Sequence, residues 1–479
     1  MLKRLIVLLM SIAMMLPFAG CGSGNTSSSV KSGDYGVVND GKPVTLLLEL
    51  GGFIPSANTE PTAEAPTVFR SMQYLADEFT KMYPNVTIEW DNTKGSFGNW
   101  SQWMTTQVAA GTAPAVTFLH GATYADKGWF VPLDNILEQP NIFIDGNTKW
   151  KDIFPSYLWN SYMTADANEN IVAIPYSLYP GSATAYYYNK DIFKKVGVSV
   201  PKNWEEFITA CKKINDAGYI AVGPAPINKT VNVNNWDIQF SLGPVYAAAI
   251  KDKWDYNGDG IMSQKELLRA EYEGVFYAKN NPAVLKMYGQ VKRKYTEVLQ
   301  KGAGNTDYES LWTQGKVAMM EDGLWRLPNE NANTQRKFDF GLFPAPVADS
   351  ATFSEAADIE MSKGPYQPPI SHSFNIVKPT VESKGEGYQD ATVKFLQWIT
   401  KPENMSQCIL EQHGTSIGAV KGTAIPPELN EWFQCEFPKL PQAQWATTTT
   451  IEGTNLTSRY LELWVSGYID DNKFIEQYD

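Results

Sequence analysis

The sequence predicts an α/β protein with more than one domain. The chain has 479 residues, of which 43% are hydrophobic, and such a length corresponds to about two to four domains that each bury a core. Short apolar runs with the length of strands alternate with segments that have helical periodicity. Aromatic residues make up 13% of the chain and charged residues only 19%, a composition that excludes a disordered protein.

The order of these segments predicts a parallel sheet covered by helices. An apolar run at 44–50 has the length of a buried strand, and residues 67–83 carry apolar side chains at helical spacing. Pro84 and Asn85 end that helix, and the alternating segment 86–90 predicts the next strand. This β-α-β order is typical of parallel sheets. The remaining predicted elements are a helix at 99–110, a strand at 115–119, strands at 171–174, 183–188, 338–343 and 373–377, and helices at 204–215 and 388–400.

Residues 1–20 have the composition of a secretory signal peptide. Lys3 and Arg4 form a positive start, and the apolar run at 5–18 is too short to span a bilayer. Small residues precede Cys21 directly, which resembles the lipobox of bacterial lipoproteins. In that pattern the cysteine thiol is lipidated and becomes the new N-terminus. The alternative is an ordinary secretory signal with an incidental cysteine.

The segment 21–43 is rich in Gly, Ser, Asn and Thr, and it predicts a flexible tether. No later stretch of the sequence approaches 18 apolar residues, so no other membrane span is expected. We therefore expect a lipid-anchored protein at the extracellular face of the cell membrane, or in the periplasm if the source has an outer membrane.

Charge and cysteine content exclude several kinds of function. The net charge of −12 argues against a nucleic-acid partner, because such a partner requires a basic surface. Beyond the lipidation site the cysteines are Cys211, Cys408 and Cys435. Outside the cell Cys408 and Cys435 could form a disulfide, whereas Cys211 lies in a helical pattern that favours a buried thiol. The three histidines have no zinc-site spacing.

Residues 255–266 match the calcium-binding loop of EF-hands at every required position. Such a loop offers the six to eight oxygen ligands that Ca²⁺ takes. Gly260 permits the sharp turn, and the predicted metal ligands are Asp255, Asn257, Asp259, the carbonyl of Ile261, Ser263 through water, and Glu266. A helix is predicted at 267–278. Alternatively, Ser263 and Glu266 form only a capping box. Because a single loop is unlike paired sensors, a structural Ca²⁺ is expected.

Several short motifs occur in a fixed order along most of the chain. They are YPNV at 83–86, QVAAGTAPAV at 107–116, GWFVPL at 128–133, IPY at 174–176, YYNKDIF at 187–193, PKNWEEF at 201–207, GKVAMM at 315–320, GLW at 323–325 and KPE at 401–403. Together these motifs resemble the family 1 extracellular solute-binding proteins of bacterial ABC sugar importers. The calcium loop is similar to that of the alginate-oligosaccharide-binding members.

The resemblance implies a two-lobe, periplasmic-binding-protein-like fold with hinge strands and a cleft between discontinuous lobes. Lobe 1 is expected at 44–178 and 372–415, and lobe 2 at 180–350 and 420–479. It further implies a monomer that closes on an oligosaccharide ligand and delivers it to the permease subunits of an ABC transporter. The sequence has no phosphate-binding GxxxxGK[ST] loop, so the ATPase must be a separate chain.

The predicted ligand site follows from sugar chemistry. Sugars present apolar faces and a rim of hydroxyls, so they are bound by aromatic plates flanked by polar groups. Trp325 matches a family position that commonly stacks on sugar, while His120 and Tyr124 follow the strand 115–119 at its carboxyl end. The candidate ligand-binding residues are Trp325, Trp236, Asp237, Asn235, Tyr179, Tyr176, His120, Tyr124, His372 and Trp445. The alternative for each aromatic residue is core packing.

The sequence favours a binding protein over an enzyme. It contains no GxSxG nucleophile motif and no recognisable acid/base signature. Two alternatives stay open at this point. A secreted glycoside-active enzyme would also be acidic and aromatic-rich and would need two carboxylates across its cleft. A binding protein for a non-sugar solute such as a peptide would share the same export signals.

Overall fold

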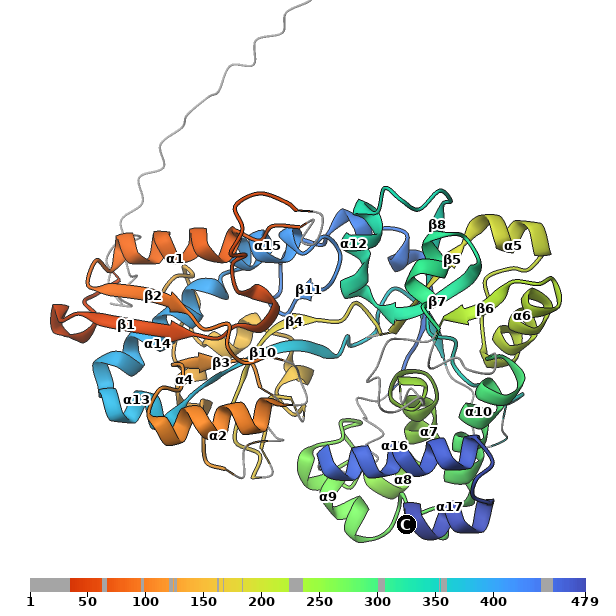
Figure 1. Ribbon diagram of the computed structural model, residues 1–479. Coiled ribbons are helices and arrows are strands. Elements are labelled where there is room, and N and C mark those ends of the chain that lie inside the picture. The colour runs from red at the N-terminus through yellow and green to blue at the C-terminus, as the bar shows by residue number, and fades with distance from the viewer. Residues whose placement is uncertain are drawn as a thin grey trace, which may run out of the picture.

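The computed structural model contains two main β-sheets, each surrounded by helices (Figure 1). It describes residues 35–62, 67–95, 99–119, 124, 127–161, 163–166, 168–182, 184–223, 236–299, 306–352, 354, 360–440 and 451–479. The predicted signal peptide and Cys21 lie outside these residues. No helix in the described part of the chain is both long and apolar enough to cross a membrane.

The first sheet has six strands in the order β11-β4-β10-β3-β1-β2. Strand β1 pairs in parallel with β2 and β3, with Leu48 opposite Val116, as the β-α-β order predicts. Strand β10 runs antiparallel to both β3 and β4. The strands are β1 (Val44–Leu48), β2 (Val86–Trp90), β3 (Val116–Thr117), β4 (Ile174–Leu178), β10 (Ile370–Ile376) and β11 (Ile417–Gly418).

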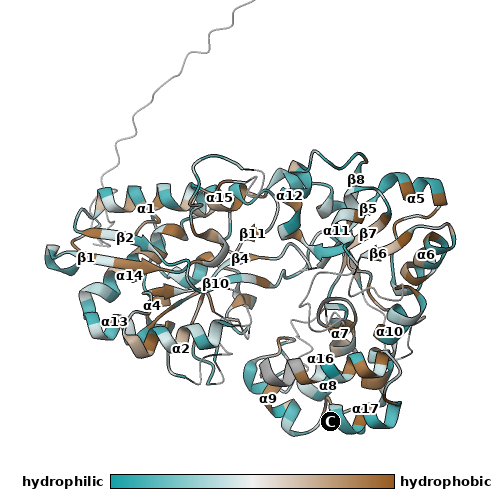
Figure 2. Cartoon of the chain, viewed as in Figure 1, coloured by the Kyte–Doolittle hydropathy of each residue, from teal (hydrophilic) through white to brown (hydrophobic). Residues whose placement is uncertain are grey.

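The helices around the first sheet are amphipathic. Figure 2 shows that β1 is largely hydrophobic, whereas helices such as α1 carry both hydrophilic and hydrophobic residues. In α1 the residues Met72, Leu75 and Phe79 face the core at helical spacing. The helices and helical turns of this part are η1 (Asn39–Gly41), η2 (Gly51–Phe53), α1 (Ser71–Met82), α2 (Trp100–Ala110), α4 (Asp134–Leu137), η4 (Trp150–Ile153), η5 (Ser156–Leu158), α13 (Lys378–Lys384), α14 (Glu386–Ile399) and α15 (Pro402–Glu411).

The second sheet has four strands in the order β6-β7-β5-β8. Strand β7 is parallel to β6 and antiparallel to β5, which also pairs antiparallel with β8. These strands are β5 (Thr184–Asn189), β6 (Ile220–Gly223), β7 (Val317–Gly323) and β8 (Phe340–Pro344), and a separate antiparallel pair consists of β9 (Met361–Lys363) and β12 (Glu436–Pro438).

Helices also surround the second sheet. Asn189 and Asn203 begin two of them, because each side chain accepts hydrogen bonds from backbone N–H groups of the first turn. The elements are α5 (Lys190–Val196), α6 (Trp204–Asp216), the π-helical turn η6 (Asp237–Leu242), α7 (Gly243–Ala249), α8 (Lys251–Trp254), α9 (Gln264–Tyr272), α10 (Pro282–Glu297), α11 (Tyr308–Thr313), η8 (Leu324–Arg326), α12 (Leu327–Ala332), η9 (Pro427–Leu429), η10 (Trp432–Gln434), α16 (Ile451–Val465) and α17 (Asp471–Tyr478).

Within the described residues, the chain passes between the two sheets three times. It leaves the first sheet after β4 to enter β5, and it returns from β8 to β10. After β11 it crosses again, since Leu429 and Trp432 pack in a hydrophobic cluster with residues of β5 and β7. Hence each sheet is built from segments that are distant in sequence (Figure 1).

The structure corrects some element boundaries. The strand expected at 171–174 is β4 and starts only at Ile174. The helix expected at 267–278 is α9, which begins at Gln264 because Ser263 caps it, and which ends at Tyr272. Cys211, Cys408 and Cys435 are all free thiols, so no disulfide joins Cys408 to Cys435.

Candidate functional site

Three aromatic side chains meet where the chain passes from the first sheet to the second. The indole rings of Trp236 and Trp325 pack edge to face, with centroids 5.4 Å apart and an interplanar angle of 86°. The phenol ring of Tyr179 lies 6.4 Å from Trp325, also edge to face. Trp325 is 41% exposed, and both Tyr179 and Trp236 are partly exposed. The sequence prediction placed all three in the ligand site, and the structure brings them together.

The orientation of Trp325 depends on the glycine that ends β7. A Cβ atom at Gly323 would lie 2.1 Å from the Trp325 ring, a distance that no side chain tolerates. The indole therefore folds back over the backbone of Gly323. The carbonyl of Gly323 also accepts a hydrogen bond of 2.9 Å from the phenol of the buried Tyr187. These contacts position an exposed aromatic ring directly after a buried strand.

Polar groups lie beside this aromatic trio. Tyr179 and Ser371 share a side-chain hydrogen bond, while burial raises the pKa of the Tyr179 phenol. Nδ1 of His372 lies 3.0 Å from the Ser371 hydroxyl and 3.1 Å from that of Ser177. His372 is partly exposed, and a Cβ atom at Gly51 would lie 3.3 Å from its imidazole ring and 2.7 Å from the ring of Phe118. Hydroxyl and imidazole groups thus continue from the aromatic trio into the first sheet.

Beyond His372 a second group of aromatic residues follows, which the sequence prediction missed. The ring of Phe118 lies 4.5 Å from His372 and 5.3 Å from Trp100. The ammonium of Lys94 sits over the Trp100 ring at 4.0 Å, a distance at which a cation is attracted to an aromatic face. The position of Phe118 in the sequence could have predicted this group. Phe118 directly follows β3, and open α/β sheets bind ligands at the carboxyl ends of their strands.

Glu49 organises this end of the first sheet. Its Oε2 atom accepts hydrogen bonds from Lys94 at 2.7 Å, from Thr117 Oγ1 at 2.8 Å and from the Phe118 amide at 2.9 Å. Its Oε1 atom accepts from the Gly51 amide at 2.8 Å. Burial lowers the pKa of Lys94, and the adjacent carboxylate opposes that shift. Both charges are therefore already partnered within the protein.

The sequence prediction named Asp237 as a candidate sugar contact, but in the structure Asp237 is a partner in a buried ion pair. Its carboxylate is fully buried and accepts both of its hydrogen bonds, at 2.8 and 2.9 Å, from the ammonium of Lys294. Lys294 donates a further bond of 2.9 Å to Glu321. Burial raises the pKa of Glu321 to about 7, with the Asp237 charge adding to that effect. Asp237 is thus held in a buried ion pair and is not exposed to a solute.

Two of the predicted aromatic residues are also core residues. Tyr176 is fully buried on β4, with its ring 4.8 Å from Phe53 and 4.9 Å from Phe374. Tyr124 is 5% exposed and stacks on Trp129 at 6.0 Å. Every residue of β4 is buried, so the strand offers no surface to a ligand. His120, Asn235 and Trp445 lie outside the described residues.

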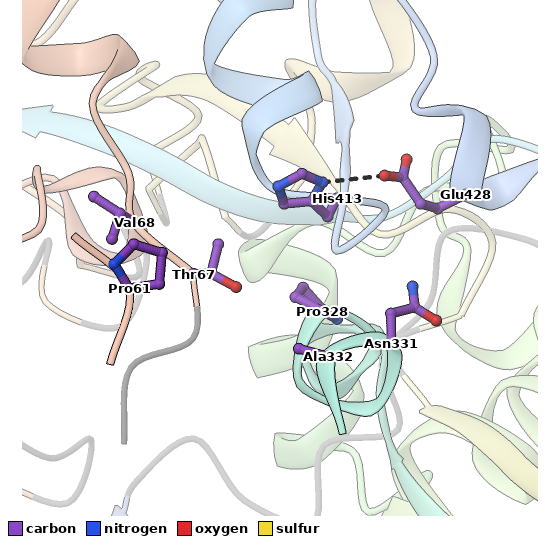
Figure 3. A pocket seen from close by; sticks show the side chains of 8 residues that line it. All are labelled: Pro61, Thr67, Val68, Pro328, Asn331, Ala332, His413 and Glu428. Atoms are coloured by element: carbon purple, nitrogen blue, oxygen red, sulfur yellow. Dashed lines mark hydrogen bonds and ion pairs between the residues drawn. The ribbon is translucent and has the colours of Figure 1, made fainter. Parts of the chain in front are cut away.

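A cavity of about 400 Å³ is lined by eight residues, none of which belongs to the aromatic trio (Figure 3). Its walls come from the segment before α1 on one side and from α12 on the other, and His413 faces Glu428 across 3.1 Å. Among the described residues, no predicted site residue lines this cavity. A second cavity of about 540 Å³ beside α5 also contains none of them.

The predicted calcium loop forms a tight turn before α9. Gly258 and Gly260 adopt positive φ angles of 80° and 76°, which permit the sharp turn. Asp255 accepts hydrogen bonds from both of these glycine amides. Asn257 accepts one from the Asp259 amide, and Asp259 accepts one from the Ile261 amide.

Glu266 closes this loop through hydrogen bonds. Its Oε1 atom accepts from the amides of Tyr256 and Asn257, and its Oε2 atom accepts from the amide and hydroxyl of Ser263. The predicted capping box is therefore present. Across the described residues no group of three or more His, Cys, Asp or Glu side chains is arranged to hold a metal ion. The donor set nevertheless consists of the oxygen atoms that Ca²⁺ prefers.

A family model described as bacterial extracellular solute-binding protein matches residues 63–406. Among curated relatives, the sn-glycerol-3-phosphate-binding periplasmic protein UgpB of Brucella abortus is 25% identical over 205 residues, which is 42% of this chain and 41% of that protein. UgpB of Rhizobium meliloti is 30% identical over 106 residues, 22% of each chain. The chain thus matches less than half the length of these relatives.

Solved structures of similar fold cover nearly the whole chain. The apo form of RafE from Streptococcus pneumoniae has a TM-score of 0.57 at 18% identity and covers 91% of this chain and 96% of its own. The GacH receptor of Streptomyces glaucescens, solved unliganded and with acarbose, has a TM-score of 0.58 at 18% identity with the same coverage. A chitin oligosaccharide binding protein reaches 0.59 at 16% identity, covering 91% and 97%. At these identities the likeness shows the fold.

Proposed function

Because the chain belongs to the bacterial extracellular solute-binding protein family, we propose that it is a monomeric receptor that captures an oligosaccharide and delivers it to the permease subunits of an ABC transporter. The site lies where the two sheets adjoin, around Tyr179, Trp236 and Trp325. Movement of the two sheets toward each other encloses the solute, and the permease reads the closed form. The protein binds its solute without chemical turnover.

The observation that carries this proposal is the partly exposed aromatic trio. Trp236 and Trp325 present indole rings at right angles to each other, and Tyr179 adds a third ring. Aromatic faces suit the apolar C–H faces of sugar rings. Ser371 and His372 supply hydroxyl and imidazole groups beside them, which suit the hydroxyl rim of the ligand.

The pairing of two buried lysines favours a neutral sugar over an anion. Lys94 and Lys294 are both buried, and each already holds a carboxylate. Neither ammonium is therefore left to pair with a phosphate or carboxylate of a solute. Among the similar proteins, RafE was solved in complex with raffinose and GacH with acarbose, whereas the UgpB proteins bind sn-glycerol 3-phosphate.

Titration calorimetry of the purified protein tests the proposal with three probes: raffinose, a chitin trisaccharide and sn-glycerol 3-phosphate. One-to-one binding of either oligosaccharide, with no reducing ends released on long incubation, is the expected result. Release of reducing ends with turnover would identify a glycoside-active enzyme instead. Binding of glycerol 3-phosphate alone would show that the solute is an anion and not a neutral sugar.

The same proposal includes a lipid anchor at Cys21. It rests on the apolar segment and the small residues that precede this cysteine. Two or more acyl chains hold a protein stably at a membrane. Cells fed radiolabelled palmitate should incorporate the label into the wild-type protein and not into Cys21→Ser. Equal labelling of the two proteins would contradict the anchor.

A structural Ca²⁺ in the loop 255–266 completes the proposal. Its support is the full match of the sequence to the EF-hand pattern and the positive φ of Gly260, which permits the sharp turn that such a loop needs. Asp255, Asp259 and Glu266 would hold the ion together with Asn257, the Ile261 carbonyl and Ser263. Bound Ca²⁺ would neutralise the carboxylates of the loop and fix the start of α9.

A further inference from the structure

We infer that Lys294 is a positioning residue for the aromatic site, because its ammonium connects the backbone segment that carries Trp236 to the segment that carries Trp325. This inference rests on the proposed function only in taking the two indoles as the ligand surface. The geometry of the connection is independent of which solute binds. The Lys294 side chain is itself buried from solvent.

The ammonium of Lys294 has four short contacts from three elements. Nζ lies 2.8 and 2.9 Å from the two carboxylate oxygens of Asp237, 2.9 Å from Oε2 of Glu321 and 3.2 Å from the Tyr186 hydroxyl. The Lys294 side chain is 1% exposed, and both carboxylates are fully buried. Asp237 starts η6, Glu321 lies on β7 and Tyr186 lies on β5, while Lys294 itself comes from α10.

Each carboxylate is close in sequence to one of the two indoles. Asp237 directly follows Trp236, and Glu321 precedes Trp325 by four residues at the end of β7. Tyr186 lies opposite Glu321 in the β5–β7 pairing, so the sheet adds a second constraint on that segment. Lys294 thus fixes the distance between the two backbone segments, and the edge-to-face contact of the indoles depends on that distance.

The helical turn after Trp236 has an uncommon backbone conformation, and its first residue belongs to this cluster. Residues Asp237–Leu242 form a π-helical turn before α7. Such turns are rare overall and occur frequently at functional sites. The ammonium of Lys294 binds both oxygens of Asp237, the first residue of the turn. The orientation of Trp236, which directly precedes the turn, therefore depends on Lys294.

Stability alone does not account for the cluster. A buried ion pair costs desolvation, and replacing a whole buried cluster with apolar side chains of similar size is often neutral or stabilising. One oxygen of Glu321 is also buried without a hydrogen-bond partner, which adds to the cost. A cluster of this kind is explained by the arrangement that it specifies, and here the arrangement is the aromatic surface.

Fluorine NMR of protein labelled with 5-fluorotryptophan tests the inference without any ligand. Trp236→Phe and Trp325→Phe assign the two resonances. In Lys294→Met, and in the apolar triple variant Asp237→Leu/Lys294→Met/Glu321→Met, these two resonances should shift or broaden while the other tryptophans keep their positions. The triple variant decides the question if Lys294→Met fails to fold, because it leaves no unpaired buried charge.

The matched control is Lys292→Met, on the same helix. Lys292 contacts Asp471 and lies over the Trp464 ring, away from the cluster. This variant should leave the Trp236 and Trp325 resonances unchanged. Unmoved resonances in the folded triple variant would overturn the inference, whether or not raffinose binds. Moved resonances with no binding of raffinose would support the inference and contradict only the sugar proposal.

Discussion

Tyr179 and Trp325 lie with ring centroids 6.4 Å apart, although they are 146 positions apart in the chain and follow strands of different sheets. Tyr179 comes directly after β4 of the first sheet, and Trp325 comes after β7 of the second. The contact therefore joins the two sheets at their connection. We expect the proposed movement of the two sheets to change this contact, which would then report on closure.

Removing the exposed indole should weaken oligosaccharide binding more than it affects stability. Trp325→Ala deletes a ring that is 41% exposed and that contacts both Trp236 and Tyr179. We expect affinity to fall about 10- to 100-fold, a cost typical of a central aromatic contact. Calorimetry with the bound oligosaccharide measures this. Tyr272→Ala, at a tyrosine that is 92% exposed on α9, is the matched control.

A smaller substitution, at Gly323, should also displace the Trp325 ring. Gly323 has extended backbone angles, so alanine is tolerated there conformationally, but its methyl group would overlap the Trp325 ring. Gly323→Ala should therefore displace the indole and weaken binding in the same direction as Trp325→Ala. Unchanged affinity in both variants would remove Trp325 from the ligand surface.

Breaking the buried pair in the first sheet should be strongly destabilising. Lys94→Met leaves Glu49 buried without its cation, although the hydrogen bonds from Gly51, Thr117 and Phe118 remain. We expect the free energy of unfolding to fall by about 3–5 kcal/mol, measured by urea denaturation. Glu49→Gln/Lys94→Met should recover much of this loss. A cost below about 1 kcal/mol, the range of surface pairs, would contradict the buried geometry.

The cluster in the second sheet should make stability depend on pH. Burial raises the pKa of Glu321 from 4.5 to about 7, so the folded state holds a proton that the unfolded chain releases at lower pH. The free energy of unfolding should therefore decrease as pH rises from about 4.5 to 7 through this group. Glu321→Gln removes the titration.

Urea denaturation between pH 5 and pH 8 compares the two proteins. The wild-type protein should lose more stability across this range than Glu321→Gln does. Glu436→Gln, at an exposed glutamate on β12, is the control and should follow the wild type. Parallel curves for the wild type and Glu321→Gln would show that Glu321 does not bind the extra proton.

Chelation should lower the melting temperature if the loop 255–266 holds Ca²⁺. An ion at 100 times its dissociation constant stabilises the folded state by about 2.7 kcal/mol. Asp255→Ala should melt at the lower temperature with or without Ca²⁺, while Asp252→Ala, at an exposed residue of α8, should still respond to the ion. Identical melting curves before and after exhaustive chelation would defeat the calcium proposal.

Local sequence signals predicted most of the first sheet correctly. The run at 44–50 and the alternation at 86–90 became β1 and β2, because each strand carries its own burial pattern. The sequence analysis did not predict strand β7, because every position of β7 is buried although the strand contains Glu321 and Asp322. A buried carboxylate is explained only by partners elsewhere, here Lys294 and Arg326.

The sequence by itself determined the α/β class and the family, because periodicity and ordered motifs are properties of neighbouring residues. Only the tertiary structure decided which residues face a solute. Tyr176 and Tyr179 are three positions apart, yet one is in the core and the other contacts Trp325. Asp237 and Lys294 are likewise paired across 57 positions. Burial depends on which distant segments pack together, and no local pattern encodes that.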